Sequence, residues 1–522
     1  MALQRLTASE RRFFSLVRQA VYANPFGERR DRVDLEIAGF AVETTTAAGF
    51  EETIGEIRRH IDCLEKENRA DIRGYAPQDR DLLTSAFLFD LFHCYADRFD
   101  RLIEEQLAAG DRSLPVLFAS AAADQLTRWG FGRGTAFRYL ALCYQLRRAY
   151  FFIERHLKGR SESMRRLRES LWDNVFTHDM DRYHRFLWNR MEDFSTLLLG
   201  ETGSGKGTAA MAIGRSGFIP FDEKNGCFEE SFTRSFTALN LSQYPASLIE
   251  SELFGHRKGA FTGAVENYAG LLDRCSPYGA IFLDEIGEVG EPIQIKLLQV
   301  LQERRFSRVG DHRARAFRGR VIAATNLAIQ RLQDGRTMRR DFFYRLCSDI
   351  IIVPPLAQRI QEDPNELEDL IPVVARRIVG TPAGELADWI AARIRQSPGI
   401  DYSWPGNVRE LEQCVRRILL KNAYSPLSVP SPPDLVSRLQ AGIRNGSLDI
   451  NALVGGYCLM LYRQHGTIEA VARNASLDRR TVKKYIAAGD QWLAGQEAPA
   501  AGTNADTSGG SHHFGQRHAK KC

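Results

Sequence analysis

Long apolar runs are missing from this 522-residue sequence, and so are clustered cysteines. No stretch of about 18 apolar residues occurs, so we expect no membrane-spanning helix. The opening MALQRLTASERRFF carries several charges and has no apolar core, so we expect no secretory signal peptide. The nine cysteines show neither CxxC pairs nor metal-ligand spacing, a pattern that indicates reduced thiols and a cytoplasmic location.

A strong excess of one charge is also absent. The formal net charge of +5 is small for this length, so only local clusters can indicate nucleic-acid binding. Hydrophobic residues make up 44% and charged residues 26%, as in ordinary globular proteins. The length predicts about three or four domains.

Helical periodicity dominates residues 1–156. In RRFFSLVRQAVYANPF, the apolar Phe13, Phe14 and Val17 recur at helical spacing, and the helix is predicted to end near Pro25. DLLTSAFLFDLFHCYADRF and AFRYLALCYQLRRAYFFIERHL each predict another helix. Their aromatic content fits a packed helical core, or alternatively the lining of a ligand pocket.

Two specialised interpretations of residues 1–156 are not favoured. His93 beside Cys94 is interpreted as part of a core rather than as a metal site. The segment also lacks the strand-end acidic pair, with a later Asp and Lys, that a phosphoacceptor receiver domain needs. We expect a mostly helical regulatory domain, inferred only from its position before the segment that follows.

The sequence changes character at about residue 195. FSTLLLG, YGAIFLDEIGE and RGRVIAATN are short β-rich apolar runs that end in small or polar residues, with helical patterns between them. This alternation predicts an α/β fold with a parallel sheet and functional groups at the carboxyl ends of its strands. After Pro354 the chain is predicted to be helical again, and SPLSVPSPPDL is typical of a linker.

A phosphate-binding loop is predicted at GETGSGKG, which follows the run STLLL and precedes the helix-like TAAMAIGR. Glycines let successive backbone N–H groups converge on phosphates, and Lys206 adds a positive charge. Gly207 stands where many such loops carry the Ser or Thr that contacts magnesium. The predicted nucleotide-binding residues are Gly200, Glu201, Thr202, Gly203, Ser204, Gly205, Lys206, Gly207 and Thr208.

A pair of carboxylates completes this prediction. In AIFLDEIGE, Asp284 ends an apolar run and is predicted to hold Mg²⁺ through water, while Glu285 polarises the attacking water. Alone, the two would be ordinary exposed carboxylates at a strand end. With a phosphate-binding loop upstream, they favour a nucleoside triphosphatase that uses ATP and Mg²⁺.

Several motifs together resemble one family, the bacterial enhancer-binding proteins, which are AAA+ activators of sigma-54 RNA polymerase. ESELFGHRKGAFTGA, FLDEIGE, VIAATN, RRDFFYRL, VPPL and WPGNVRELE occur in the family's order. The resemblance covers about residues 157–425 and 450–490. It implies an AAA+ α/β subdomain at 157–355, a helical lid at 356–428, a linker at 429–449 and a Fis-type helix-turn-helix at 450–492. The remaining 493–522 is predicted to be a disordered tail.

The resemblance also implies roles for single residues around the nucleotide. Asn326 is similar to the family's γ-phosphate sensor, and Arg409 to the lid arginine that reports nucleotide state. Asn240 is similar to the asparagine that holds Glu285 in one nucleotide state and releases it in another. The family usually carries a glutamate at the position of Gly207, so contacts at the start of the helix are expected to differ.

Two arginines match the family's arginine-finger positions, Arg339 and Arg345 in MRRDFFYRL. A planar guanidinium stabilises charge that spreads over phosphoryl oxygens. Such a finger comes from a neighbouring subunit, so the resemblance implies a ring, expected to be a homo-hexamer. Taken singly, either residue also fits an ordinary surface arginine.

The diagnostic feature of the resemblance is GAFTGA, which comprises Gly259, Ala260, Phe261, Thr262, Gly263 and Ala264. Small residues give a backbone that bends freely, and Phe261 stands alone among them. The resemblance implies that Phe261 contacts sigma-54 and that hydrolysis moves the loop. In the alternative interpretation, the Phe261 ring folds back into the core.

A basic helix-turn-helix is predicted near the end of the sequence, in GTIEAVARNASLDRRTVKKYI. Val471 packs the first helix, NAS forms the turn, and Asp478 begins the second helix as its N-cap. Binding to double-stranded upstream DNA is expected from the second helix, although a basic solvated helix is the simpler alternative. The expected contacts are Arg479, Arg480, Lys483 and Lys484.

The sequence therefore favours an ATP-hydrolysing transcriptional activator of sigma-54 RNA polymerase that works from an upstream DNA site, with no membrane partner. Two alternatives stay open. One is a DNA-binding regulator whose ATPase serves only assembly. The other is an AAA+ remodeller outside transcription, in which GAFTGA would have no purpose.

Overall fold

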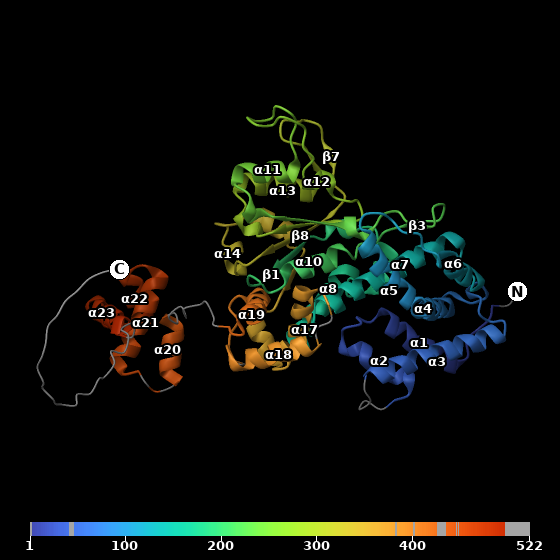
Figure 1. Cartoon of the computed structure of the whole chain (residues 1–522), viewed down its shortest axis with the longest axis horizontal. Coiled ribbons are helices and arrows are strands. Elements are labelled where there is room, and N and C mark those ends of the chain that lie inside the picture. Colours follow the sequence, from blue (N-terminus) through green and yellow to red (C-terminus); the bar gives the residue numbers. More distant parts are fainter. Residues whose placement is uncertain are drawn as a thin grey trace, which may run out of the picture. The chain divides into compact units, whose positions relative to one another are not determined.

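The computed structural model describes residues 3–40, 46–381, 384–399, 402–424, 435–444, 446 and 448–495 (Figure 1). The chain divides into two compact units, Met1–Tyr424 and Ser425–Cys522. The proline-rich segment 425–434 and the predicted tail from residue 496 lie outside the described residues. No helix in the described ranges is long and apolar enough to cross a membrane.

Helices make up the first part of the first unit, as the periodicity predicted. Their bounds are α1 (Ala8–Tyr22), α2 (Glu28–Ala38), α3 (Thr46–Lys66), α4 (Pro77–Cys94), α5 (Ala96–Ala109), α6 (Ala119–Arg128) and α7 (Arg133–His156). A capping box begins α1, because the Thr7 hydroxyl accepts the Glu10 N–H while the Glu10 carboxylate accepts the Thr7 N–H. Phe14 and Val17 are buried on its inner face.

The segment DLLTSAFLFDLFHCYADRF, predicted as one helix, is divided between α4 and α5. The break is at Tyr95, where the backbone has φ −108° and ψ 5°. The Tyr95 ring stacks on Phe118 at 5.5 Å between centroids, and this packing outweighs the continuous helical pattern of the sequence.

A parallel sheet with strand order β4-β5-β8-β1-β9 lies at the centre of the unit. The strands are β1 (Thr196–Leu199), β4 (Phe236–Asn240), β5 (Ala280–Asp284), β8 (Arg320–Thr325) and β9 (Asp349–Ile352). Each neighbouring pair runs parallel, which confirms the α/β prediction. Because parallel strands share one carboxyl edge, Asn240 and Asp284 stand opposite one another there.

Helices and short strands surround this sheet. They are α8 (Glu162–Phe176), α9 (Met180–Arg182), α10 (Lys206–Gly214), β2 (Phe221–Asp222), β3 (Cys227–Phe228), α11 (Ala246–Phe254), α12 (Leu271–Arg274), α13 (Glu291–Glu303), β6 (Arg305–Phe306), β7 (Arg315–Ala316), α14 (Ile329–Gln333) and α15 (Arg340–Leu346). Successive residues of a strand point to opposite faces, and the two faces enter different cores. Leu198 and Phe282 join a core with α10 and the N-terminal helices, whereas Leu197 and Leu283 join a core with α11, α13 and α15.

Helix α7 is attached directly to the end of α10. The fully buried Arg148 donates to the backbone carbonyls of Arg215 and Gly217, both at 2.7 Å. Gln145 donates to the carbonyl of Ser216 at 2.9 Å. These bonds satisfy backbone acceptors of the phosphate-loop helix with side chains from the N-terminal helices, so both regions form one continuous block.

The segment 177–194 packs into the same core. After α9 it forms a π-helical turn over Tyr183–Leu187. Tyr183 is buried, and its hydroxyl accepts a hydrogen bond from Gln145 at 2.7 Å. The segment 177–194 therefore joins the N-terminal helices to the motor.

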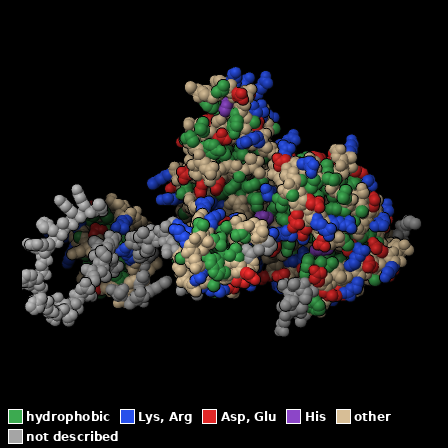
Figure 2. Space-filling model, viewed as in Figure 1, with side chains coloured by type: hydrophobic (Ala, Val, Ile, Leu, Met, Phe, Trp, Pro, Cys, Tyr) green, Lys and Arg blue, Asp and Glu red, His purple; other side chains and the backbone are tan. Residues whose placement is uncertain are grey.

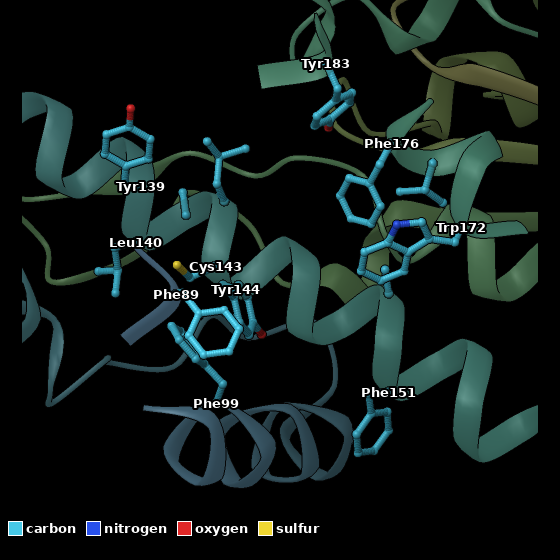
Figure 3. Packing of buried hydrophobic residues seen from close by; sticks show 14 of the residues in the cluster. Phe89, Phe99, Tyr139, Leu140, Cys143, Tyr144, Phe151, Trp172, Phe176 and Tyr183 are labelled. Atoms are coloured by element: carbon cyan, nitrogen blue, oxygen red, sulfur yellow. The ribbon is translucent and has the colours of Figure 1, made fainter. Parts of the chain in front are cut away.

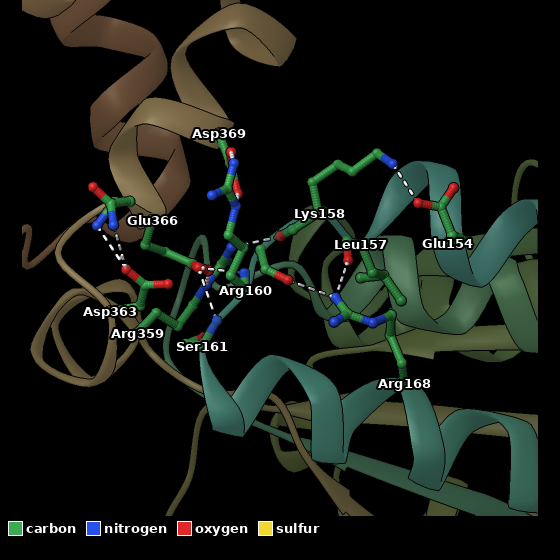
Figure 4. Close-up of polar contacts among 12 residues, drawn as sticks. Glu154, Leu157, Lys158, Arg160, Ser161, Arg168, Arg359, Asp363, Glu366 and Asp369 are labelled. Carbon is green, nitrogen blue, oxygen red and sulfur yellow. Dashed lines mark hydrogen bonds and ion pairs between the residues drawn. The ribbon is translucent and has the colours of Figure 1, made fainter. Parts of the chain in front are cut away.

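A helical lid follows the sheet, with α16 (Leu356–Glu362), α17 (Glu366–Val379), α18 (Gly384–Gln396) and α19 (Asn407–Lys421). Its own core includes Ile390, Trp404 and Leu411. The lid also binds the connection between α7 and α8, where the Glu366 carboxylate accepts the backbone N–H groups of Arg160 and Ser161 (Figure 4).

The second unit contains α20 (Leu435–Arg444), α21 (Ile450–His465), α22 (Ile468–Ala475) and α23 (Arg479–Gly495). Helix α20 lies within the segment predicted as a linker, because Leu435 and Leu439 pack against Leu459 of α21. Helices α21 and α23 cross closely, since a Cβ added at Gly489 would lie 2.4 Å from the Gly455 carbonyl oxygen.

Candidate nucleotide site and partner surfaces

The phosphate-binding loop joins β1 to α10, as predicted. Gly203 has φ +80° and Gly205 φ +112°, conformations that favour glycine. A Cβ at Gly203 would lie 2.4 Å from the Gly406 carbonyl oxygen, so the lid approaches the loop at a position where only glycine fits. The glycines of GETGSGKG thus allow the positive φ angles of the loop, and at Gly203 they also allow the lid backbone to approach closely.

Lys206 lies inside this loop. Its Nζ donates to the carbonyl oxygens of Gly200 at 2.8 Å and Glu201 at 3.1 Å. Burial lowers the pKa of Lys206, while Glu285 and Asp284 act in the opposite direction. The ammonium is therefore partly removed from water and aimed at the space that the loop encloses.

The strand-end carboxylates lie beside the loop. The Asn240 amide donates to Asp284 Oδ2 at 3.3 Å, and the Glu285 N–H donates to Asp284 Oδ1 at 3.1 Å. Glu285 has φ +56°, a conformation that turns it away from the strand direction. Asn240, expected to hold Glu285 in one nucleotide state and to release it in another, contacts Asp284 in this structure.

A cavity of about 670 Å³ collects these groups. Of the predicted residues it is lined by Thr202, Gly203, Ser204, Gly205, Lys206, Gly207, Thr208, Asn240, Asp284, Glu285 and Arg409. Asn326 is not part of the lining, but its amide donates to Thr202 Oγ1 at 3.3 Å at the edge of the loop. The arrangement can hold a phosphorylated ligand against backbone N–H groups and a lysine, with carboxylates opposite.

Arg339 and Arg345 lie apart from this cavity and do not line it. Arg339 forms ion pairs with Glu291 at 2.6 Å and Asp341 at 2.8 Å. Arg345 Nη2 donates to the Leu301 carbonyl at 2.9 Å. Neither guanidinium serves the nucleotide cavity of its own chain, which is the geometry that the arginine-finger prediction requires.

Several residues that line or brace the cavity were not predicted. His156 and Lys158, from the end of α7 and the connection to α8, line it together with Arg377 and Glu412 of the lid. Asn407 braces the loop, because its amide donates to Glu201 Oε2 at 2.9 Å and to the Thr202 carbonyl at 3.2 Å. Asn407 and Glu412 had a signal in the sequence, since both belong to WPGNVRELE.

The GAFTGA loop lies between α11 and α12, at the top of Figure 1. The Gly259 N–H donates to the Ala264 carbonyl at 2.8 Å and so closes the loop at its base. The Arg257 N–H donates to the Val309 carbonyl at 3.0 Å and ties the loop to the turn between β6 and β7. Phe261 is 40% exposed, and its ring makes an edge-type contact with the His256 ring at 4.9 Å between centroids.

The second unit holds the predicted helix-turn-helix. Val471 and Val482 are fully buried in the core between the helices, and Asp478 caps α23 by accepting the N–H groups of Arg480 and Thr481. Of the predicted turn NAS, Asn474 and Ala475 belong to α22, and the chain turns at the left-handed Ser476. The side chains of Arg479, Arg480, Lys483 and Lys484 are all exposed.

Comparison with known proteins places this geometry in a family. Residues 179–351 match the Sigma-54 interaction domain. The chain is 38% identical over 230 residues to the Sigma54-dependent transcriptional activator SfnR of Pseudomonas putida, covering 43% of this chain and 57% of SfnR. It is 32% identical over 329 residues to the regulatory protein AtoC of Escherichia coli, covering 61% of this chain and 67% of AtoC. The chain belongs to the family of sigma-54-dependent transcriptional activators.

Membership of this sigma-54 activator family identifies the parallel sheet, phosphate-binding loop and lid as an AAA+ ATP-binding domain. Among solved structures, that of NtrX from Brucella abortus in complex with ADP is 20% identical, with a TM-score of 0.38, and covers 72% of this chain and 80% of that chain. The match to SfnR spans little more than half of that relative, and the match to AtoC two thirds.

Proposed function

We propose that this chain hydrolyses ATP, binds upstream DNA and remodels the sigma-54 RNA polymerase closed complex through its GAFTGA loop. The observation that carries the proposal is the position of Phe261. Its large apolar ring is 40% exposed on a loop that is closed at its base by backbone hydrogen bonds. An exposed aromatic ring on a protruding loop fits a contact with a partner protein.

The nucleotide site supplies residues for hydrolysis. Lys206 would exchange its carbonyl contacts for phosphate oxygens, and Glu285 would orient the attacking water. The oxygen atoms of Asp284 and Asn240 are the kind of donor that Mg²⁺ prefers, so these residues fit a magnesium ion held through water. When bound, the ion would offset the negative charge of the phosphates.

The missing Ser or Thr at Gly207 is compatible with this site. A Cβ added at Gly207 would meet only Phe282, at 4.0 Å, so the position is open rather than blocked. Arg339 and Arg345 are proposed to reach the nucleotide of the next subunit in a homo-hexameric ring, because they lie outside the cavity of their own chain.

Phe261→Ala tests the role of the loop. Truncation of a central aromatic anchor costs about 2 kcal/mol or more of binding, roughly a thirty-fold loss. The variant is expected to assemble and hydrolyse ATP at the wild-type rate, but to fail to activate transcription and to bind sigma-54 weakly in a transition-state-analogue complex. ATPase assays, co-elution with sigma-54 and transcription in vitro measure the three properties.

Leu248→Ala provides a matched control, because Leu248 is 42% exposed on α11 outside the loop. This variant should activate normally. If Phe261→Ala abolishes hydrolysis or unfolds the unit, the ring belongs to the core. If it activates normally, the contact lies elsewhere. A Lys206→Ala protein that still activates would favour a regulator whose ATPase serves only assembly.

The DNA contact is proposed for the exposed basic side chains of α23. Replacement of Arg480 and Lys483 by Ala should weaken binding to the upstream site and lower the slope of log affinity against log salt by about one unit for each lost phosphate contact. ATPase activity should remain, since these residues belong to the other compact unit. Fluorescence anisotropy at several salt concentrations measures the slope, and an unchanged slope and affinity would remove both residues from the interface.

A further inference from the structure

A second cavity, of about 1000 Å³, lies away from the nucleotide site in the first unit. It is lined by residues of α1, α2, α3, α4, α5, α7 and α8 and by residues 180–185. Protein interiors contain few voids larger than a water molecule, and ligand cavities occupy about 300–1,000 Å³. A space of this size is therefore ligand-sized, and the sequence had left a pocket in this region as an alternative to a packed core.

Aromatic side chains dominate the walls. In Figure 3, Trp172 and Phe176 project from α8 toward α7, which carries Tyr139 and Cys143. The aromatic and imidazole residues of the lining are Tyr22, Phe50, Phe89, Phe92, His93, Tyr139, Tyr150, Trp172, Phe176, Tyr183 and His184. Burial lowers the pKa of His93 to about 3, so this imidazole is neutral at physiological pH. Such walls suit a flat ring.

The charges of the lining favour a ligand without negative charge. Each lining arginine already has a carboxylate partner: Arg30 pairs with Asp34 at 2.7 Å, Arg147 with Asp100 at 2.6 Å, and Arg18 and Arg185 with Asp181 at 3.6 and 3.0 Å.

Three carboxylates of the lining lack such a partner. Asp31, Glu51 and Asp97 are exposed and form no ion pair within the described ranges. They give the mouth of the cavity an excess of negative charge, which attracts cations and repels anions.

Buried polar atoms without partners also line the cavity. Asp34 Oδ1, Arg18 Nε, Trp172 Nε1 and His184 Nε2 are buried, belong to residues that line the cavity, and have no hydrogen-bond partner in the described chain. Buried polar atoms are nearly always satisfied. An occupant that draws these side chains toward itself would gain hydrogen bonds that the protein itself does not supply.

We propose that this cavity binds a small aromatic amine, with its ring among the aromatic walls and its ammonium group near the acidic mouth. The site is formed jointly by the N-terminal helices and the motor, so its occupant also touches the ATP-binding domain. This proposal goes beyond the proposed function, and binding to the cavity does not depend on it.

Helix α8 connects the cavity to the sheet. Trp172 and Phe176 line the cavity, while Asn174 between them donates to Thr196 Oγ1 of β1 at 3.0 Å and to Asp349 of β9. Arg320 of β8 donates to Asn174 Oδ1 at 2.8 Å. Because β1 leads into the phosphate-binding loop, a ligand that shifts Trp172 acts on the element that positions this loop. Binding of a ligand in this cavity is therefore expected to change the ATPase rate through α8. This expected effect rests on the proposed function.

Calorimetric titration of the full chain tests the site with tryptamine, indole and indole-3-acetate, which share one ring system and differ in charge. Tryptamine is expected to bind saturably with one site per chain, and indole-3-acetate at least about tenfold more weakly. The variant Asp31→Asn/Glu51→Gln/Asp97→Asn should weaken tryptamine about tenfold and leave indole unchanged. These three carboxylates are exposed, so the variant is expected to fold.

Matched controls separate the possible outcomes. Glu36→Gln/Glu105→Gln/Asp388→Asn neutralises three exposed carboxylates outside the lining and should leave tryptamine binding unchanged. Absence of tryptamine binding at millimolar concentration, or equal binding by both triple variants, would overturn the proposal. Tryptamine binding with an unchanged ATPase rate would refute communication through α8 but not the site. Binding by a chain that never hydrolyses ATP would contradict the proposed function alone.

Discussion

Arg339→Ala and Arg345→Ala proteins are expected to bind ATP almost as the wild type does. Their rate of ATP hydrolysis is expected to fall by about 10³-fold or more. The reason is geometric. Neither side chain lines the nucleotide cavity of its own chain, so neither contributes to binding there. A guanidinium placed from a neighbouring subunit stabilises the charge that develops on the transferred phosphoryl group, which is needed for the reaction and not for binding.

Mixing experiments distinguish fingers that act between subunits from arginines that only support the fold. Arg345→Ala mixed with Lys206→Ala should regain part of the activity, because some interfaces then combine an intact phosphate loop with an intact Arg345. Arg340→Ala is the control, since Arg340 is exposed on the same helix and should hydrolyse ATP normally. No rescue at any mixing ratio, with ring assembly verified, would contradict fingers acting in trans.

Glu366→Ala is expected to lower the free energy of unfolding of the first unit by about 3–5 kcal/mol. The Glu366 side chain is fully buried, and its Oε1 accepts a hydrogen bond from Arg359 at 2.6 Å (Figure 4). Burial already lowers the pKa of Arg359, and removal of Glu366 would leave this cation buried without its partner. The variant would also release the backbone N–H groups of Arg160 and Ser161.

Urea denaturation of the full chain, followed by far-UV circular dichroism, measures this loss. Asp369→Ala is the matched control on the same helix, because Asp369 pairs with the largely exposed Arg160 and should cost at most about 1 kcal/mol. The double variant Arg359→Met/Glu366→Leu should recover much of the loss, since it removes both buried charges together. If Glu366→Ala and Asp369→Ala lower the free energy of unfolding equally, the buried pair stabilises the unit no more than an exposed pair does.

The sheet and its nucleotide groups could be predicted because their signals are local. A short apolar run that ends in a functional residue, such as the one before Asp284, indicates both a buried parallel strand and the edge at which its last side chain lies. The helix-turn-helix was predicted for the same reason, from Val471, Val482 and the cap at Asp478. The predicted turn NAS was wider than the observed one, because Asn474 and Ala475 belong to α22 and the turn is made at Ser476.

The residues that the lid adds to the nucleotide cavity, and the helix in the predicted linker, could not be predicted from the local sequence pattern. Lys158 and Arg377 are separated by more than 200 residues and line the same cavity because the lid packs on the connection between α7 and α8. Tyr95 interrupts an otherwise continuous helical pattern through a ring contact with Phe118, far along the chain. Helix α20 was obscured by the prolines before Leu435, although its own apolar residues pack as a helix should.

The hydrogen bonds from Arg148 and Gln145 to the end of α10 affect how regulation can be studied genetically. Deletion of the first 156 residues would strip three backbone carbonyls of their donors and remove α7 from its packing against α10. A loss of ATPase activity in such a truncated protein would then result from misfolding. A gain of ATPase activity would not measure regulation, because the motor would have lost part of its core. Point substitutions at the cavity, which leave this shared core in place, are the sounder way to ask what the N-terminal helices do to the motor.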